Sequence, residues 1–248
     1  MVLVSVYLYH HVSLKMFLDK DYYFVIYGGG SDIIQSVYKK YSDSYFISII
    51  RNTKANYKIG ETISTNDDDW FKKLSKKVNS CSKDKLLVYI NAATFQLEKL
   101  FVSHKISEID EITKIGINYQ LWIAKLISEK MLINKSGRLI NLSSFRSKIP
   151  ANGTSLYSSI KSFNNTFFQT LGLEYGRFNI TANSISIGFA DTKLLKNLDK
   201  SKIQNYKNSI TKNQFLPLSE FTDCIDYIIK SKYLNCANID LDGGLKKI

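Results

Sequence analysis

A tyrosine and a lysine stand four residues apart at Tyr157 and Lys161, in the segment Tyr-Ser-Ser-Ile-Lys. On a helix this spacing places the phenol and the ammonium group on the same face. A nearby cation stabilises a phenolate, so we expect Lys161 to lower the pKa of Tyr157 from its usual value of about 10. Ser144 ends an apolar run 13 residues before Tyr157. A tyrosine in this setting can give and take a proton, which is the chemistry of a general acid–base group. The pair is common, and taken by itself it is better interpreted as chance exposure on a helix surface.

A run of three glycines, residues 28–30, follows the first strongly apolar segment. That segment, Tyr22–Tyr27 (YYFVIY), ends abruptly at the glycines, and a helical pattern begins at Asp32. Glycines in this position let the main chain approach a pyrophosphate, and the helix N-terminus offers N–H groups and the positive end of its dipole. A plain tight turn is the alternative interpretation. The position after the first strand of an alternating chain favours a dinucleotide site.

Short apolar runs alternate with longer amphipathic stretches along the whole chain. The runs expected to form strands are Tyr22–Tyr27, Tyr45–Ile50, Tyr57–Ile63, Leu86–Ile90, Arg138–Leu142 and Thr181–Ile187, and the main helical stretches are Asp32–Tyr41, Trp70–Val78, Glu108–Lys130 and Tyr157–Gly176. This alternation predicts a Rossmann-type doubly wound α/β fold, with a parallel β-sheet and helices on both faces. Ligands bind such a fold at the carboxyl ends of its strands. We expect a single domain over residues 22–248 and an N-terminal extension over residues 1–21, with Met16 as an alternative translation start.

The 248 residues carry a formal charge of +12, and 44% of them are hydrophobic. That apolar content excludes a disordered chain, and no stretch reaches the ~18 apolar residues that a membrane span needs. The lysines are spread along the chain without a nucleic-acid recognition motif, so we interpret them as solvated helix faces. Neither the three cysteines nor the three histidines have metal-site or disulfide spacing, which favours a reducing, cytoplasmic setting and no metal.

Several further motifs stand in order between Tyr22 and Leu245. With them the chain resembles the short-chain dehydrogenase/reductase (SDR) family. Within that family, its general likeness is to the 3-oxoacyl-carrier-protein reductase type. The glycine turn, the Tyr-x-x-x-Lys pair and the strand leading to Ser144 (GRLINLSS) all match the family's pattern. The remaining matches are Asn91-Ala92-Ala93, Asn118, Asn179–Ile185, Gly188–Thr192 (GFADT) and Leu241-Asp242-Gly243-Gly244.

The resemblance implies an oxidoreductase whose nicotinamide cofactor carries the hydride. Tyr157 then donates a proton to a carbonyl during reduction, or accepts one from an alcohol during oxidation. Lys161 lowers the pKa of Tyr157 and holds the nicotinamide ribose, while Ser144 hydrogen-bonds the carbonyl oxygen. Asn118 steadies a water that connects Lys161 to solvent. The cofactor-binding residues implied by the same resemblance are Gly28, Gly30, Ser31, Asp32, Ile33, Arg51, Asn91, Ala92, Ala93, Tyr157, Lys161, Gly188, Ala190 and Thr192.

The end of the second predicted strand bears on the choice between NADP and NAD. Family members that use NAD resemble one another in placing an acidic residue there. In this chain the segment is Ile-Ile-Arg-Asn-Thr-Lys, without an acid and with Arg51 in position to meet a 2′-phosphate. The sequence therefore favours NADP. NAD is the alternative if Arg51 only stacks on the adenine.

The departures from the family's pattern cluster around the cofactor. Asp32 and Ile34 stand where the family has its second and third glycines, and Tyr27 replaces the preceding threonine. The other departures are Ile90, Ala93 and Ile187. Because the acid–base residues are kept, we expect catalysis to be retained, while the strength of cofactor binding is left open.

The leading hypothesis is an NADP-dependent enzyme that interconverts a ketone and a secondary alcohol. Its substrate is open between two classes of small carbonyl compound. One is an acyl thioester on an acidic carrier protein, which Lys130 and Arg177 would contact; the other is a sugar-derived carbonyl, which the polar segment Lys193–Leu216 would suit as a lid. A non-catalytic NAD(P)-binding protein with a structural or regulatory role is the alternative. Neither nucleic acid nor a membrane is expected as a partner.

The two longest helical patterns, Glu108–Lys130 and Tyr157–Gly176, also predict self-association, because the family commonly pairs through these helices. A homodimer or homotetramer is expected. The apolar residues that fit this use are Leu121, Trp122, Phe167 and Phe168, although burial in the core is an alternative role for each.

Overall fold

The structure is a computed structural model, and it describes residues 22–51, 60–95, 97–192 and 199–245. The expected N-terminal extension, including Met16, lies outside the described residues, as do Asn52 and the first part of the expected lid. The expected third strand over Tyr57–Ile63 lies partly outside them, and the strand seen there is Glu61–Ser64.

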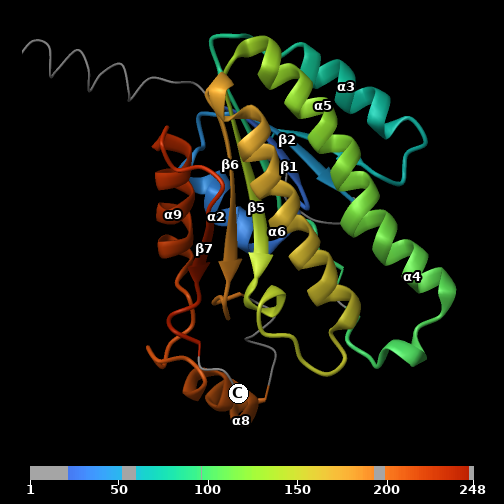
Figure 1. Cartoon of the computed structure of the whole chain (residues 1–248), viewed down its shortest axis with the longest axis vertical. Coiled ribbons are helices and arrows are strands. Elements are labelled where there is room, and N and C mark those ends of the chain that lie inside the picture. Colours follow the sequence, from blue (N-terminus) through green and yellow to red (C-terminus); the bar gives the residue numbers. More distant parts are fainter. Residues whose placement is uncertain (1–21, 52–59, 96, 193–198, 246–248) are drawn as a thin grey trace, which may run out of the picture.

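A seven-stranded parallel sheet forms the centre of the molecule, in the order β3-β2-β1-β4-β5-β6-β7 (Figure 1). Each neighbouring pair of strands is parallel, and β1 lies between β2 and β4. The strands are β1 (Tyr22–Tyr27), β2 (Tyr45–Ile50), β3 (Glu61–Ser64), β4 (Leu86–Asn91), β5 (Gly137–Ser144), β6 (Ile180–Ile187) and β7 (Asn238–Leu241). The predicted Rossmann-type doubly wound α/β fold is confirmed.

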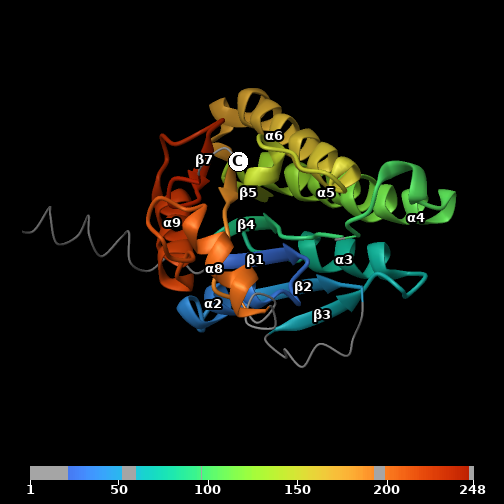
Figure 2. The same cartoon turned by 90° about the horizontal axis from the view of Figure 1, so that it is seen from below.

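Helices cover both faces of the sheet, as the view from below shows (Figure 2). One face carries α3, α5 and α6, and the other carries α2 and α9. The helices are α2 (Asp32–Lys40), α3 (Trp70–Asn79), α4 (Ile106–Thr113), α5 (Tyr119–Asn134), α6 (Ser155–Tyr175), α8 (Lys200–Asn208) and α9 (Leu218–Lys230). In Figure 1, α8 lies below the carboxyl ends of the strands. Within the described residues, no helix has both the length and the apolar character needed to cross a membrane.

Successive residues of β1 supply the two separate cores that these layers create. Tyr23, Val25 and Tyr27 pack against the α3, α5 and α6 layer. Phe24 and Ile26 pack against the α2 and α9 layer. Side chains alternate across a strand, so a strand covered on both faces must be apolar throughout. This is why the run YYFVIY forms a central strand.

The long helix expected over Glu108–Lys130 is divided. A single π-helical turn, Lys114–Asn118, separates α4 from α5. The hydroxyl of Tyr27 donates to the carbonyl of Ile115 at 2.9 Å, and a Cβ on Gly116 would lie 2.8 Å from Ile160 of α6. The widened turn therefore releases a carbonyl to the sheet and lets α6 approach closely, which the sequence pattern did not reveal.

Arg138, near the start of β5, is almost fully buried without an acidic partner among the described residues. Its Nε donates to the carbonyl of Ile229 at the end of α9, at 2.9 Å. Its Nη1 donates to the carbonyls of Gly137 at 2.8 Å and Asn179 at 3.2 Å. The arginine thus ties β5 to the C-terminal helix and to the loop before β6, which fixes the two strands that end at the site.

Candidate active site

Two adjoining hollows lie at the carboxyl ends of the central strands. The tyrosine hollow has a volume of about 260 Å³ and lies between Ser144, Tyr157, Lys161 and Gly188. The glycine hollow has a volume of about 280 Å³ and lies between Gly28, Gly30, Arg51 and Phe95. Both are also lined by Ser31, Ala92 and Thr94. The two hollows therefore form one cleft across the strand ends, shaped for a ligand with two parts.

Most of the site residues expected from the sequence line this cleft. Those in the tyrosine hollow are Ser31, Asp32, Ile33, Ala92, Ser144, Tyr157, Lys161, Gly188 and Thr192. Those in the glycine hollow are Gly28, Gly30, Ser31, Arg51, Ala92 and Ala93. Asn91, Asn118 and Ala190 line neither of these two hollows. Asn91 is buried and its amide donates to Asn141 at 3.1 Å, so its place is inside the sheet.

Tyr157 lies on the first turn of α6, and its hydroxyl meets side chains from two strand ends. Hydrogen bonding by the side chains of Ser144 and Thr94 lowers its pKa. Burial acts in the opposite direction and is larger, so the pKa of Tyr157 is raised above 10. The expected lowering of this pKa is therefore wrong for the structure described, because helix spacing reports which groups are neighbours and not how deeply they are buried.

Lys161 lies one turn further along α6 and is almost fully buried. Its Nζ donates to the carbonyl of Leu142 at 2.8 Å and to that of Ala93 at 3.5 Å. The same atom lies 5.8 Å from the centre of the Tyr157 ring. Burial lowers the pKa of Lys161 to about 8. The site thus holds an amine that can exchange a proton near neutral pH, close to the phenol.

Ser144 is the last residue of β5, and it begins a short 3₁₀ turn, Phe145–Ser147. Its Oγ accepts a hydrogen bond from the main-chain N–H of Arg146 at 3.2 Å. The carbonyl of Ser144 accepts one from Ser147 Oγ at 2.7 Å. With Oγ accepting the N–H of Arg146, the hydroxyl still has a proton to donate, and Ser144 lines the tyrosine hollow, where a carbonyl oxygen can receive it.

Asn118 closes the π-helical turn and is exposed to solvent. The structure does not bring it into the cleft with Lys161. The polar residue that faces this turn is Asn164, which lies on α6 beyond Lys161, is 2% exposed and donates to the Gly116 carbonyl at 3.4 Å. Thr94 is a second residue that the sequence did not single out. The sequence feature that could have identified it is its position directly after the Asn91-Ala92-Ala93 motif.

The main chain at the glycine hollow fits a dinucleotide. Gly28 has a φ of +85°, and a Cβ there would lie 2.5 Å from the Ala93 nitrogen, so only glycine lets the two loops meet. Ser31 precedes α2 but makes no side-chain cap. Its Oγ is buried without a hydrogen-bond partner in the described part of the chain. An unpaired hydroxyl beside a helix N-terminus is suited to a phosphate oxygen.

Arg51 follows β2 at the rim of the glycine hollow. Its Nη1 forms an ion pair with Glu111 of α4 at 2.9 Å, and both side chains are about half exposed. Its guanidinium lies 5.0 Å from the centre of the Phe95 ring. The ion pair with Glu111 holds Arg51 at the hollow, but water screens the pair strongly. Arg51 can therefore turn toward a bound anion at a small cost in free energy. Among the described residues, no group of His, Cys, Asp or Glu side chains is placed to hold a metal ion.

The model of the short chain dehydrogenase family matches residues 50–203, which include β5, Ser144, Tyr157 and Lys161. The chain belongs to this family. It is therefore an oxidoreductase of the SDR family, and membership implies a nicotinamide cofactor.

Curated SDR relatives and solved structures agree with this assignment. A 3-oxoacyl-[acyl-carrier-protein] reductase of Buchnera aphidicola subsp. Acyrthosiphon pisum is 25% identical over 179 residues, covering 71% of this chain and 73% of the relative. An acetoacetyl-CoA reductase of Allochromatium vinosum is 22% identical over 64% of this chain and 65% of its own. A solved short-chain dehydrogenase/reductase structure shares the fold with a TM-score of 0.77, at 14% identity, over 91% of this chain and 97% of its own.

Proposed function

We propose that this SDR enzyme interconverts a ketone and a secondary alcohol with NADP, using Tyr157 as the group that gives or takes the proton. The observation that carries the proposal is the meeting of Tyr157, Ser144 and Lys161 in a hollow that continues into the glycine hollow. Acid–base residues at one end of a cleft and a phosphate-binding turn at the other suit a dinucleotide reaction.

The raised pKa of Tyr157 keeps its proton on the phenol at neutral pH. The phenol is therefore ready to act as an acid and protonate a carbonyl oxygen as negative charge develops there. Ser144 Oγ donates to the same oxygen and stabilises that charge. Lys161, with a pKa of about 8, supports the phenolate that remains. A nicotinamide dinucleotide supplies the hydride when it is bound.

This chain's own residues account for how the dinucleotide would be held. Gly28 and Ser31, with the first turn of α2, would receive the pyrophosphate. Lys161 would bind the nicotinamide ribose. Arg51 would meet the 2′-phosphate of NADP, for which a guanidinium is well suited. Glu111 competes for Arg51, so NADP must displace an existing ion pair.

For the substrate, we propose a 3-oxoacyl thioester on an acidic carrier protein, because several relatives are named as reductases of such compounds. The charge of +12 would attract an acidic carrier. Lys130 is partly exposed and its Nζ donates to the Asn79 carbonyl at 2.9 Å, while Arg177 is exposed and stacks on Phe178. A carrier protein could contact both at the surface. A sugar-derived carbonyl is the other candidate from the sequence, and a carbonyl panel separates the two.

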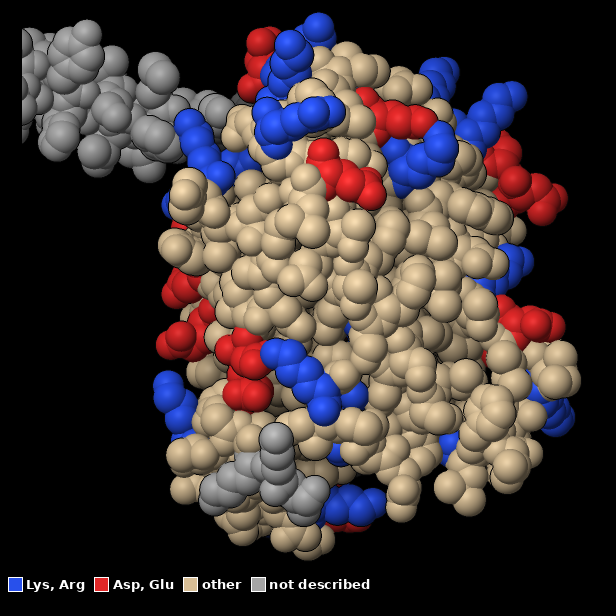
Figure 3. Space-filling model, in the orientation of Figure 1, with Lys and Arg blue, Asp and Glu red and all other residues tan. Residues whose placement is uncertain are grey.

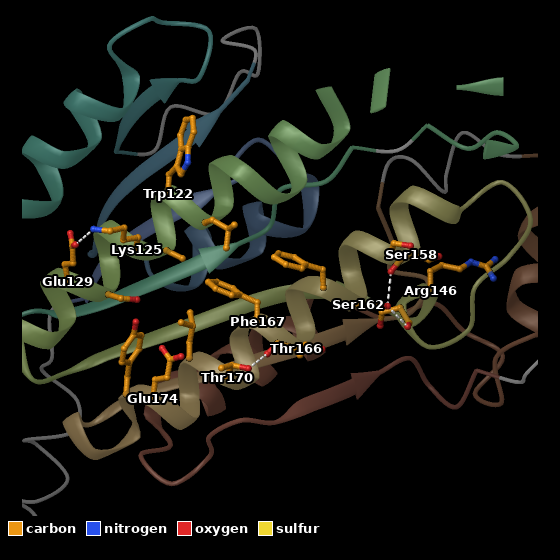
Figure 4. A pocket seen from close by; sticks show the side chains of 18 of the residues that line it. Trp122, Lys125, Glu129, Arg146, Ser158, Ser162, Thr166, Phe167, Thr170 and Glu174 are labelled. Atoms are coloured by element: carbon orange, nitrogen blue, oxygen red, sulfur yellow. Dashed lines mark hydrogen bonds and ion pairs between the residues drawn. The ribbon is translucent and has the colours of Figure 1, made fainter. Parts of the chain in front are cut away.

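We further propose that two copies associate through α5 and α6. The outer faces of these helices form an apolar groove of about 1290 Å³ (Figure 4). Trp122 and Phe163 are exposed there, whereas Phe168 is fully buried in the core, so it takes no part. Figure 3 shows few charges over the middle of this face and charges of both signs around its margin. A second copy carries the same apolar groove and the same margin of positive and negative charges, so its face would complement this one.

A dinucleotide titration followed by a carbonyl panel tests the proposed activity. We expect NADPH to bind more tightly than NADH, with quenching of its fluorescence, and a 3-oxoacyl thioester to be reduced. Binding of NADPH without turnover on any thioester, ketone or sugar carbonyl would support the non-catalytic alternative instead. Absence of binding to either dinucleotide would contradict both. The oligomeric state is read separately by analytical ultracentrifugation, where a Trp122→Glu variant should remain monomeric.

A further inference from the structure

A row of amide side chains runs inside the molecule from β4 to β5 and then to α6. Asn91 Nδ2 donates to Asn141 Oδ1 at 3.1 Å. Asn141 Nδ2 in turn donates to Asn165 Oδ1 at 3.2 Å and to Ser184 Oγ at 3.1 Å. Asn91 and Asn141 are at most 1% exposed, so these hydrogen bonds are shielded from water. Hydrogen bonds shielded in this way hold their members rigidly. Only Asn91 Oδ1, at the start of the row, is buried without a partner among the described residues of this row.

The row continues from α6 to the serine of the site. Asn165 Nδ2 donates to Ser147 Oγ at 3.0 Å, and Ser147 Oγ lies 2.7 Å from the carbonyl oxygen of Ser144. A serine hydroxyl has a single proton. Because the amide of Asn165 already occupies Ser147 Oγ as a donor, the proton of Ser147 must go to the Ser144 carbonyl. Every link therefore donates in the same direction, toward Ser144.

The row joins elements that carry different parts of the chemistry. Ser144 stands on β5, whereas Tyr157 and Lys161 stand on α6, and Asn165 lies one turn beyond Lys161 on that helix. A second contact supports the same junction, since Ser162 Oγ of α6 lies 2.8 Å from the Ser147 carbonyl and 2.9 Å from the Ser158 carbonyl, and its single proton is shared between them. Relative motion of β5 and α6 would change the distance between Ser144 and Tyr157. Asn165 is thus placed to limit that motion.

We propose that Asn165 is a positioning residue that fixes the Ser144 hydroxyl against Tyr157, through Ser147. The proposal rests on the proposed function, because it assigns Ser144 the task of donating to the substrate oxygen. Asn165 itself lines neither of the two hollows. It acts through the direction of its amide, which sets the proton of Ser147.

The variant Asn165→Asp changes the direction of the hydrogen bond to Ser147 while keeping the size of the side chain. Aspartate keeps an oxygen to accept from Asn141, but its second oxygen accepts the Ser147 proton, and the Ser144 carbonyl then loses its donor. Ser147→Ala removes the same final bond without changing α6, and it serves if Asn165→Asp fails to fold. Gln169→Ala is the matched control, because Gln169 is exposed on the same helix and lines neither the cleft nor the groove between α5 and α6.

The first measurement is steady-state kinetics in two backgrounds. In the wild-type background, Asn165→Asp should lower kcat about ten- to a hundredfold, as a misplaced catalytic group does, and leave the NADPH Kd unchanged. In the Ser144→Ala background the same substitution should change kcat less than about twofold, because coupled residues are not additive. An equal loss in both backgrounds would overturn the proposal, since Asn165 would then act on the fold or on Tyr157 directly.

The second measurement needs no turnover. Hydrogen–deuterium exchange over residues 145–149 should be faster in Asn165→Asp and Ser147→Ala than in Gln169→Ala and the wild type. Unchanged exchange there would also overturn the proposal. If exchange changes as expected but no carbonyl compound is reduced, the positioning of Ser144 holds and the proposed activity fails.

Discussion

The two ends of the cleft use different parts of the chain. At the tyrosine hollow, the chemistry comes from the side chains of Ser144, Tyr157 and Lys161. At the glycine hollow, the fit to a dinucleotide comes mainly from the main chain, at the turn of Gly28 and the first turn of α2. The acid–base side chains of the family are kept at the first hollow, whereas departures from its pattern line both hollows, with Asp32 and Ile187 at the first and Tyr27 and Ala93 at the second. A binding site made from main-chain groups tolerates new side chains as long as its turn is preserved.

The replaced residues show how this tolerance arises. Ile34, which stands in place of a glycine, is fully buried in the core beneath α2 and does not line the cleft. Tyr27, in place of a threonine, directs its hydroxyl to the Ile115 carbonyl. Ile34 therefore adds apolar packing away from the cleft, whereas Tyr27 lines the glycine hollow with its hydroxyl bonded to the π-helical turn. Neither side chain replaces the main-chain turn at Gly28.

The largest expected effect tests the side-chain end of the cleft. Tyr157→Phe removes only the phenolic oxygen, so kcat should fall by about 10²–10⁴-fold, the range for loss of a general acid. The NADPH Kd should stay within about twofold of the wild type. Stopped-flow reduction assays and fluorescence titration measure the two quantities. The control is Tyr23→Phe, which removes a phenolic oxygen near the start of β1, at the end of the strand away from the cleft. An active Tyr157→Phe enzyme would show that Tyr157 is not the proton donor.

A glycine substitution tests the main-chain end. Gly28→Ala forces a Cβ against Ala93 at a positive φ, which should lower stability by about 2–4 kcal/mol and abolish NADPH binding. Gly153→Ala is the matched control: Gly153 has a similar φ of +80°, but its nearest contact would be 3.4 Å from Lys99. Urea unfolding of both variants measures the loss of stability and separates the cost of alanine at a positive φ, which both share, from the cost of the close contact with Ala93, which only Gly28→Ala has. Equal losses in the two variants would mean that the approach of the two loops is not tight.

Lys161→Met should make the protein more stable while abolishing its activity. At pH 7 the folded protein buries a charged amine, so the substitution should raise the free energy of unfolding by about 1–3 kcal/mol. The pKa of Lys161 is lowered from 10.5 to about 8 on folding. Between these values the unfolded state binds more protons, so wild-type stability should gain from this group as the pH rises from 8 to 10.5.

In Lys161→Met that gain should disappear. Urea titrations at pH 7 and pH 9.5 measure it, with the exposed Lys125→Met as the control for loss of a positive charge. A Lys161→Met protein that is less stable than the wild type at pH 7 would show that the amine is not held at an energetic penalty.

The smallest effects concern Arg51. Arg51→Asp should reduce the preference for NADPH over NADH by about tenfold, the value of a charge-assisted hydrogen bond. Glu111→Gln should act in the opposite direction and strengthen NADPH binding up to about fivefold, because it removes an exposed ion pair of about 0.2–1 kcal/mol. Competitive titrations of the two dinucleotides measure both. If Glu111→Gln weakens NADPH binding, the ion pair orients Arg51 and does not compete for it.

The sequence predicted best those strands whose residues are apolar throughout. The runs Tyr22–Tyr27 and Tyr45–Ile50 are strands with those bounds, since they are apolar throughout and end at turns. β7 was missed because its four residues are half exposed and polar in alternation. The helix α9 was also missed. The π-helical turn depends on Tyr27 and Ile160, which are distant in sequence, so no local pattern could reveal it.

The candidate site was predictable in its membership but not in its energetics. Residue types and spacing identified Ser144, Tyr157 and Lys161. The direction of the Tyr157 pKa depends on burial by segments far along the chain, which spacing does not report. Asn118 matched a motif, yet it is exposed because the π-helical turn that it closes changes the phase of the helix.

The strand order carries a consequence for the growing polypeptide. β1 pairs with β2 at one edge, but its other edge pairs only with β4, with Tyr22 opposite Leu86. During translation, β1 to β3 therefore emerge with a fully apolar strand whose second edge has no neighbour. Unpaired apolar edges are templates for aggregation. Nascent chains that stop short of residue 86 should accordingly depend on chaperones, and the release of β4 should end that dependence.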